Sequence, residues 1–353
     1  MLSEAKHSGI YKAKECRDSS LPSVPQSEMP ASSNSNVPER ADEIHGSDQR
    51  WYSIRRLALR RLDRMMSLEP KVLRGHDPDA IHDFRVASRR LQQVLDLLFP
   101  TPKSAEIRRL RRRIRKCRRL FSDVRNCDVL IAHAGRQLRA ARPVRRDAWE
   151  AFAAYLRVRR EKEHARALRR LSHLNLAEVY VHLRKSFALD QQEPDSDKAE
   201  AQAASHSSPH ERLSDEMQRV WQAFAARCEQ AEGEKGGAAI HACRIAAKRL
   251  RYLSEVVDKA GVKGAREPLE WLRKVQDLLG GWHDLEIAEQ MMAEMIARPV
   301  FLREHPDLAA GVLKLMDRNR RAKEQGLRKF PGVGLDSPGG RRFKEWAERV
   351  SAK

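Results

Sequence analysis

The sequence predicts an all-α protein made of two successive helical bundles behind a disordered N-terminal leader. Apolar residues recur at three- and four-residue steps, and the alternation of β-branched residues that is typical of strands is rare. A third observation is an internal repeat: IHDFRVASRRL at 81–91 returns as IHACRIAAKRL at 240–250, with six of the eleven positions identical. A repeat of this kind indicates a duplicated structural unit.

Two segments lack helical periodicity and divide the chain. Residues 1–45 are rich in Ser, Pro and Asn, a composition typical of disorder, and DQQEPDSDKAEAQAASHSSPH at 190–210 has the same character. We therefore expect a leader over 1–45, a first bundle over 46–188, a linker over 189–209 and a second bundle over 210–353. Each bundle contains one copy of the repeat.

Proline and glycine mark where the helices of the two bundles should end. The stretch from Ile107 to Phe121 illustrates the helical spacing between such breaks, with Leu110, Ile114 and Cys117 on the same face. A loop is expected at FPGVGLDSPGG, followed by a short final helix, RRFKEWAERV. The expected breaks are 99–103, 141–143, 258–268, 297–299, 305–306 and 330–340.

The net charge of +20 predicts a polyanionic partner such as nucleic acid, an anionic surface or a phosphate polymer. Residues 1–50 hold six Lys and Arg against eight Asp and Glu, so the rest of the chain carries about +22. The five cysteines form no CxxC pair, and no stretch is apolar enough for a signal peptide or a spanning helix. We therefore expect a cytoplasmic protein without a membrane partner.

Each copy of the repeat places a histidine and cations on one stripe of a helix. At about 100° per residue, His82, Arg85 and Arg89 lie close together, beside an apolar face that can turn to the core. His241, Arg244 and Lys248 repeat the arrangement. The arginine fork suits phosphate oxygens, and lysine adds a movable charge.

The helix after each copy adds further cations. RRLRRRIRKCRR at 108–119 holds nine Lys and Arg in twelve positions, and WLRKVQD in the second half keeps Arg273 and Lys274. Like charges at this spacing destabilise an isolated helix, which favours a bound anion. The competing interpretation is that a basic run is simply a solvated face and that a histidine at a core edge is only hydrogen-bonded. The duplication and the net charge favour anion binding.

At these residues the chain resembles the CHAD domain family, named for conserved histidines in an α-helical domain. RNCDVLIA at 125–132 and LLGGWHDLEIA at 278–288 resemble the second part of the family signature, although Ser122, Asn126 and His283 depart from its usual pattern. The resemblance covers about residues 46–350. It is carried by His82-x-x-Arg85-Val86-x-x-Arg89-Arg90-Leu91 and His241-x-x-Arg244-Ile245-x-x-Lys248-Arg249-Leu250-Arg251-Tyr252.

The resemblance implies two four-helix bundles related by pseudo-two-fold symmetry, with a basic central groove that binds inorganic polyphosphate. It also implies binding without catalysis, with some members associating with polyphosphate granules and their proteins. The primary candidates for polyphosphate contact are His82, Arg85, Arg89, Arg90, His241, Arg244, Lys248, Arg249 and Arg251. The secondary candidates are Arg115, Lys116, Arg119, Arg125, Arg273 and Lys274.

Three other functions compete with this expectation. Nucleic-acid binding is the alternative, but the 108–119 segment contains no aromatic residue on which bases could stack. An enzyme would need a nucleophile, a base or a metal site, and the sequence shows no close acidic pair and no HExxH spacing, so we expect no cofactor, no metal and no catalytic residue. His-dependent phosphotransfer or metal chelation at His82 and His241 is the remaining enzymatic alternative. A scaffold with a basic surface that binds an acidic protein or a granule coat is the third possibility.

Overall fold

The computed structural model describes residues 40–75, 77–99, 105–140, 143–188, 209–234 and 236–352. These residues form helices joined by short turns, with no strand among them, which confirms the all-α prediction. Of the predicted leader, residues 1–39 lie outside the described residues, while 40–45 belong to the first helix. The predicted linker also lies outside them, except for Pro209.

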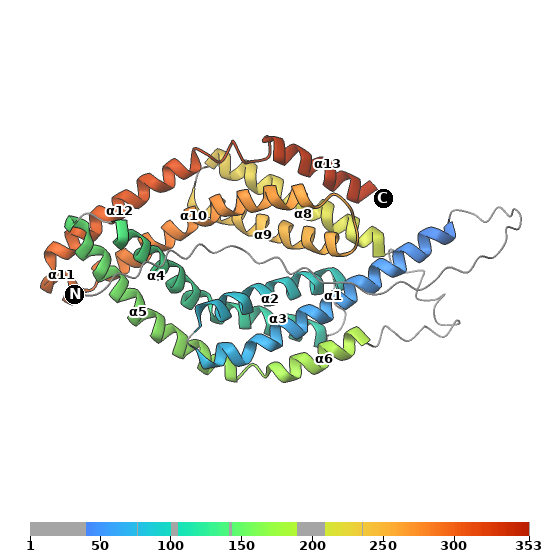
Figure 1. The fold of residues 1–353 in the computed structure, drawn as a ribbon, viewed down its shortest axis with the longest axis horizontal. Coiled ribbons are helices and arrows are strands. Elements are labelled where there is room, and N and C mark those ends of the chain that lie inside the picture. The colour runs from blue at the N-terminus through green and yellow to red at the C-terminus, as the bar shows by residue number, and fades with distance from the viewer. Residues whose placement is uncertain are drawn as a thin grey trace, which may run out of the picture. The chain divides into compact units, whose positions relative to one another are not determined.

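Figure 1 shows the order of the helices along the chain. Residues 42–353 form one compact unit. The helices of the first half are α1 (Arg40–Arg74), α2 (Pro78–Leu98), α3 (Ala105–Leu120), α4 (Ser122–Ala140), α5 (Pro143–Ser172) and α6 (Leu176–Ala188). Those of the second half are α8 (Pro209–Glu234), α9 (Gly237–Lys259), α10 (Arg266–Ile296), α11 (Pro299–Glu304), α12 (Pro306–Leu327) and α13 (Pro338–Ala352).

The predicted breaks coincide with helix ends. Prolines stand at the first position of α5, α11, α12 and α13, where the fixed φ angle suits the helix and the missing N–H is not needed. The loop expected over 330–340 is present but ends early, because α13 already begins at Pro338.

Four further breaks were not predicted: a one-residue turn at Phe121 between α3 and α4, and three others described next. Gly75 between α1 and α2 has a φ of +81°, a conformation that glycine adopts without strain. Asp77 then caps α2 by accepting a hydrogen bond of 2.8 Å from the backbone N–H of Asp79. Between α5 and α6, Asn175 accepts a hydrogen bond from the N–H of Glu178. The third break separates α8 from α9 and ends at Gly236, the N-cap of α9.

The buried apolar side chains form two clusters. The larger one is built from α1, α2, α3, α6, α8, α9 and α13, with the first half of α10 and the end of α5. The smaller one joins α4 and α5 to α10 and α12, with Phe152 and Met292 fully buried at its centre. The helices of the smaller cluster come from both halves of the sequence, so the two halves share this part of the core.

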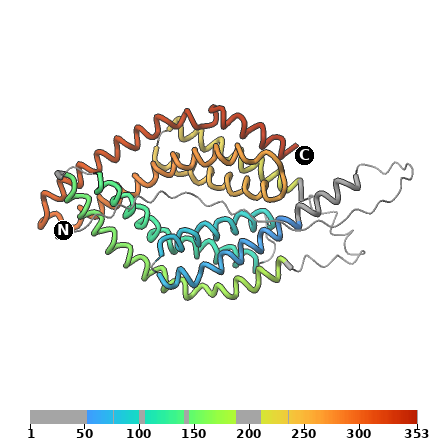
Figure 2. Tube along the Cα trace, in the orientation of Figure 1, coloured from blue at the N-terminus to red at the C-terminus, as the bar shows by residue number. Residues whose placement is uncertain are grey.

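The helices that carry the repeat contact each other. α2 packs against α9, and Figures 1 and 2 show the two helices side by side between the outer layers. Ile81 and Phe84 of α2 and Ile240 and Leu250 of α9 are buried, so the apolar face of each copy is turned into the core. The cationic stripe beside each apolar face is thereby brought toward the other half. The division into two bundles and their pseudo-symmetry stay predictions.

Candidate anion-binding site

Six cations from four helices lie close enough for their charges to interact, and we call them the cation cluster. They are Arg85 and Arg89 of α2, Arg118 of α3, Arg125 of α4, and Arg244 and Lys248 of α9. Helix α10 adds Asp284, whose carboxyl interacts with the charges of Arg125, Arg244 and Lys248. The two copies of the repeat therefore contribute to one site.

Arg85 is held in place by hydrogen bonds to the turn between α3 and α4. Its guanidinium donates to the backbone carbonyl of Arg118 at 2.6 Å and to the hydroxyl of Ser122 at 2.9 Å. Burial and the nearby charge of Arg89 lower the pKa of Arg85 to about 10. The Ser122 hydroxyl, at one of the positions that depart from the family pattern, thus orients a cation of the cluster.

Arg89 connects the two halves directly. Its guanidinium donates to the hydroxyl of Tyr252 at 3.4 Å and lies 5.7 Å from the centre of the same ring. A cation over an aromatic face is attracted by the ring quadrupole, so this contact fixes the position of Arg89 without neutralising its charge. Tyr252 itself is buried, with 7% of its surface exposed.

Lys248 has the most strongly shifted pKa of the cluster. Burial, followed by the charges of Arg244, Arg89 and Arg85, lowers its pKa to about 6. Arg244 is also half-buried, and its Nε atom is buried without a hydrogen-bond partner in the described part of the chain. Because like charges repel in a poorly solvated site, these cations are electrostatically unfavourable neighbours in the free protein.

The histidines of the repeat lie at the edge of this cluster. His82 and His241 are exposed, and the ring of His241 lies 5.3 Å from that of His283 on α10. Partial desolvation of the rings lowers the pKa of all three imidazoles. The charge of Arg125 lowers it further at His82, and that of Arg244 does so at the other two, so that the pKa of His283 is about 3. They are therefore neutral near pH 7 and can donate or accept a single hydrogen bond.

Three predicted contact residues are instead paired with acidic side chains. Arg90 binds Glu255 at 2.9 Å, and Arg251 approaches the same carboxylate at 3.3 Å. Arg249 binds Glu216 of α8 at 3.2 Å. These pairs reduce the net charge that the three arginines can offer to a ligand, and their role in binding stays a prediction.

The secondary candidates other than Arg125 are exposed on two helices. Arg115, Lys116 and Arg119 lie on α3, and the charges of Arg115 and Arg119 help to lower the pKa of Arg118 to about 10, after burial. Arg273 and Lys274 are exposed on α10. The α3 cations therefore adjoin the cluster, whereas Lys274 lines a separate pocket beside α13.

Sequence reasoning missed several members of the site. Arg118 belongs to the basic run at 108–119 but is not among the candidates predicted from it, and Tyr252 appears in the prediction only as the last residue of the second motif. Asp284 lies within the motif at 278–288 and was not predicted to be a neighbour of Arg244. Its counterpart in the first half, Asp128, is buried in an ion pair with Arg160. The two halves are thus not equivalent at this position.

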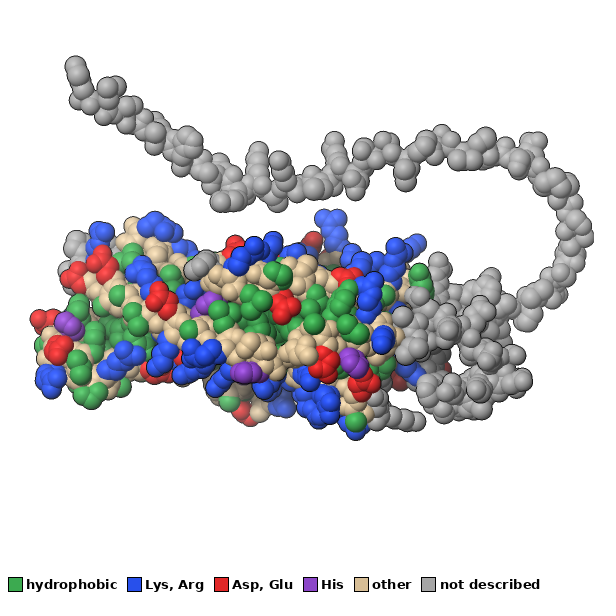
Figure 3. All heavy atoms as spheres, turned by 90° about the horizontal axis from the view of Figure 1, so that it is seen from below, with side chains coloured by type: hydrophobic (Ala, Val, Ile, Leu, Met, Phe, Trp, Pro, Cys, Tyr) green, Lys and Arg blue, Asp and Glu red, His purple; other side chains and the backbone are tan. Residues whose placement is uncertain are grey.

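The described residues offer neither a metal-binding group nor a membrane-spanning helix. Within the described part of the chain, no group of three or more His, Cys, Asp or Glu side chains could hold a metal ion. None of the helices that the structure describes is long and apolar enough to cross a membrane. Figure 3 shows Lys and Arg spread among acidic and apolar side chains on one outer face, without a continuous basic band there.

The fold and the cluster define an all-α domain in which two sequence-related helices assemble one multi-cation site. A family model of the CHAD domain matches residues 56–293, and the chain therefore belongs to the CHAD domain family. The crystal structure of the CHAD domain from the plant Ricinus communis has the same fold, with a TM-score of 0.55 and 19% sequence identity over 84% of this chain and 90% of that chain. A search of the curated proteins gave no match.

Proposed function

We propose that this protein binds inorganic polyphosphate at the cation cluster and acts by binding, without catalysis. The observation that carries the proposal is that Arg85, Arg89, Arg244 and Lys248, from both copies of the repeat, meet in one half-buried site, where burial and the three arginines lower the pKa of Lys248 to about 6. A polymer with one negative charge on each phosphate relieves this repulsion at several cations together. Because binding removes part of the repulsion, the free energy of the polyphosphate complex falls relative to that of the free protein.

The contacts of the cluster support binding by a preorganised site. Arg85 and Arg89 are oriented by Arg118, Ser122 and Tyr252, so little side-chain entropy is lost when phosphate oxygens meet their guanidinium groups. Each charge-assisted hydrogen bond contributes about 1.5–3 kcal/mol. The neutral histidines at the edge add hydrogen bonds to non-bridging oxygens.

Nucleic acid is the alternative ligand, because it carries the same phosphate charge. Single-strand binders usually stack bases on exposed aromatic rings. The aromatic residue that contacts the cluster, Tyr252, is buried, and Arg89 covers its ring. A polymer without bases needs no such platform, so the composition of the site favours polyphosphate.

Longer polymers would extend beyond the cluster. The exposed Arg115, Lys116 and Arg119 on α3 continue the positive charge from Arg118. We propose that they contact further phosphates along a basic groove between the two halves. On this basis the protein would associate with polyphosphate granules in the cytoplasm, beside other granule proteins.

A competition assay tests the ligand. Labelled long-chain polyphosphate is bound at one fixed salt concentration and displaced by single-stranded DNA, duplex DNA or RNA at matched phosphate. The expected result is that nucleic acids displace it only at a large excess. Equal competition by nucleic acid would show that the charge serves a less selective purpose.

Two variants that each replace four basic residues locate the site. The cluster variant replaces Arg85, Arg89, Arg244 and Lys248 by Ala. The control variant replaces Arg146, Arg166, Arg219 and Arg266 by Ala, all of them at least 46% exposed and in ion pairs on outer helix faces. Circular dichroism checks that both fold. The cluster variant should lose its preference for polyphosphate, and the control should keep it; equal losses in both would contradict a localised site.

The granule association has its own test. A tagged copy is imaged in cells with and without polyphosphate, together with the cluster variant. Granular localisation that depends on the polymer and on the cluster supports the proposal. Localisation that is unchanged without polyphosphate would contradict it.

A further inference from the structure

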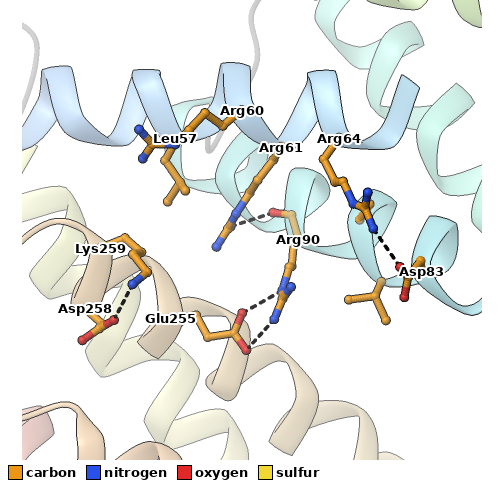
Figure 4. Close-up of a pocket in the computed structure, with 11 residues that line it drawn as sticks. Leu57, Arg60, Arg61, Arg64, Asp83, Arg90, Glu255, Asp258 and Lys259 are labelled. Atoms are coloured by element: carbon orange, nitrogen blue, oxygen red, sulfur yellow. Dashed lines mark hydrogen bonds and ion pairs between the residues drawn. The ribbon is translucent and has the colours of Figure 1, made fainter. Parts of the chain in front are cut away.

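A second basic pocket lies between α1, α2 and α9 and contains none of the six residues of the cation cluster. Its volume is about 440 Å³, and Figure 4 shows Arg61 and Arg64 of α1, Arg90 of α2 and Glu255 of α9 around it. A volume of this size is within the range of about 300–1,000 Å³ that small-molecule sites occupy. The pocket is therefore large enough for a small metabolite.

Arg61 is a buried cation that the surrounding protein satisfies only in part. Its side chain is 8% exposed and reaches from α1 toward the pocket (Figure 4). It donates one hydrogen bond, of 2.9 Å, to the backbone carbonyl of Arg90, its single hydrogen-bond partner within the described residues. A guanidinium has five N–H donors, and burying a charge is costly unless it is paired.

The nearest carboxylate is already engaged by other arginines. Glu255 accepts two hydrogen bonds from Arg90, at 2.9 and 3.4 Å, and lies 3.3 Å from Arg251. Burial lowers the pKa of Arg61 to about 10 even though the charge of Glu255 acts in the opposite direction. Arg61 therefore remains a cation at neutral pH without a carboxylate of its own.

The remaining charges of the pocket leave an excess of positive charge. Arg64 is paired with Asp83 at 2.8 Å, and Lys259 lies 3.5 Å from Asp258. The lining thus pairs Arg64, Arg90 and Lys259 with three carboxylates, while Arg60 and Arg61 form no ion pair within the described residues. An excess of two positive charges matches a dianion.

The other wall of the pocket is apolar. Leu57 of α1 and Ala87 of α2 are 7% and 6% exposed, and Val86 lies beside Ala87. Bare phosphate would leave this wall in contact with water. A molecule with an uncharged body would bury it and gain about 25 cal/mol for each Å² of apolar surface.

We propose that this pocket binds a small phosphate monoester, with its dianionic phosphate at Arg61 and its uncharged body against Leu57, Val86 and Ala87. The proposal does not depend on the function of the cation cluster. Arg61 supplies parallel N–H donors to two phosphate oxygens, and Arg60 adds positive charge at the entrance. Arg90 keeps its bonds to Glu255 and forms the floor.

Calorimetric titration of the full chain with phenyl phosphate tests the proposal. Phenyl phosphate should bind with 1:1 stoichiometry, and benzoate, which has the same ring and a single charge, should bind about ten-fold or more weakly. Inorganic phosphate, which lacks the body, should also bind more weakly. Failure of phenyl phosphate to bind, or equal affinity for benzoate, would overturn the proposal.

Three variants test whether phenyl phosphate binds in this pocket. Arg61→Gln should weaken binding of phenyl phosphate about ten-fold or more. Val86→Phe fills the pocket while keeping every charge, so it should also abolish binding and remains informative if the Arg61 variant fails to fold. Arg146→Gln, on the exposed face of α5, should leave binding unchanged. Normal binding by a folded Arg61→Gln or Val86→Phe variant would overturn the assignment.

A fourth variant separates the pocket from the proposed polyphosphate site. Arg244→Gln removes a cation of the cluster and should keep full affinity for phenyl phosphate. If that variant loses phenyl phosphate binding, the ligand occupies the cation cluster and the second site does not exist. Conversely, failure of polyphosphate binding in the native chain leaves this test intact, because phenyl phosphate is the probe.

Discussion

Arg90 of α2 and Glu255 of α9 form an ion pair with two hydrogen bonds, of 2.9 and 3.4 Å, between the two halves of the chain. The same carboxylate faces Arg251, and its charge also acts on the buried Arg61. One acidic side chain therefore compensates cations from three helices at the place where the halves meet. Its removal leaves positive charges close together in a partly buried site.

We expect Glu255→Gln to lower the free energy of unfolding by about 1–2 kcal/mol, because Glu255 is 16% exposed and Arg90 is 41% exposed. Urea denaturation followed by circular dichroism measures the change. The matched control is Glu150→Gln, which breaks an exposed pair with Arg146 and should cost at most about 0.5 kcal/mol. Equal losses of unfolding free energy in the two variants would show that the Arg90–Glu255 pair stabilises the protein no more than an exposed surface pair.

Charge reversal should affect the two copies of the repeat to a similar degree. Arg85 and Arg244 both belong to the cation cluster and both act on Lys248. Arg85→Glu and Arg244→Glu should each weaken polyphosphate binding about ten-fold or more, measured by titration at fixed salt. A strong effect of one variant and none of the other would show that the halves are not used equally.

The acidic member of the site should oppose polyphosphate binding. Asp284 lies among Arg125, Arg244 and Lys248, and its carboxylate offsets part of their charge. Asp284→Asn should tighten polyphosphate binding several-fold, most clearly at low salt, where charges are least screened. Weaker binding in this variant would mean that Asp284 serves chiefly to position the cations.

Polyphosphate affinity should fall as the pH rises above about 6. In the free protein, burial and Arg244, Arg89 and Arg85 hold the pKa of Lys248 at about 6, against the opposing charge of Asp284. A bound polyanion raises this pKa, so binding takes up a proton between the free and the bound value. Titration in buffers of different ionisation enthalpy measures the uptake. Lys248→Met should remove it, and an unchanged uptake in that variant would contradict the assignment.

The same lysine should destabilise the free protein. The folded-state pKa of Lys248 is about 6, below the ordinary 10.5 of an unfolded chain, so the unfolded state binds an extra proton between these values. Stability therefore rises with pH across this window, and at pH 7 most of the penalty is present. Lys248→Met should raise the melting temperature at pH 7, by about 1.5 °C for each kcal/mol of relieved penalty in a unit of this size. A lower melting temperature would contradict this.

Most of the fold could be predicted from local sequence. Helical periodicity and the prolines at 99–103, 141–143, 297–299 and 305–306 set the class and most of the helix ends, because these effects act within a few residues. The break at Gly75 escaped this reasoning, since a single glycine is a weak signal until its positive φ is seen. The packing of α4, α5, α10 and α12 around one apolar cluster was also not predicted, because it depends on contacts between segments that are distant in the sequence.

The candidate site, like the fold, could be predicted from the sequence only in part. The sequence by itself determined that two helices carry a histidine and cations on one stripe, because helix geometry alone places residues three and four apart on one side. Only the tertiary structure decided that Arg85, Arg89, Arg244 and Lys248 share one cluster while Arg90 turns to Glu255. Helix packing determines which side chains meet across the two halves, and the electrostatic energy of a cation depends on those neighbours and on its burial.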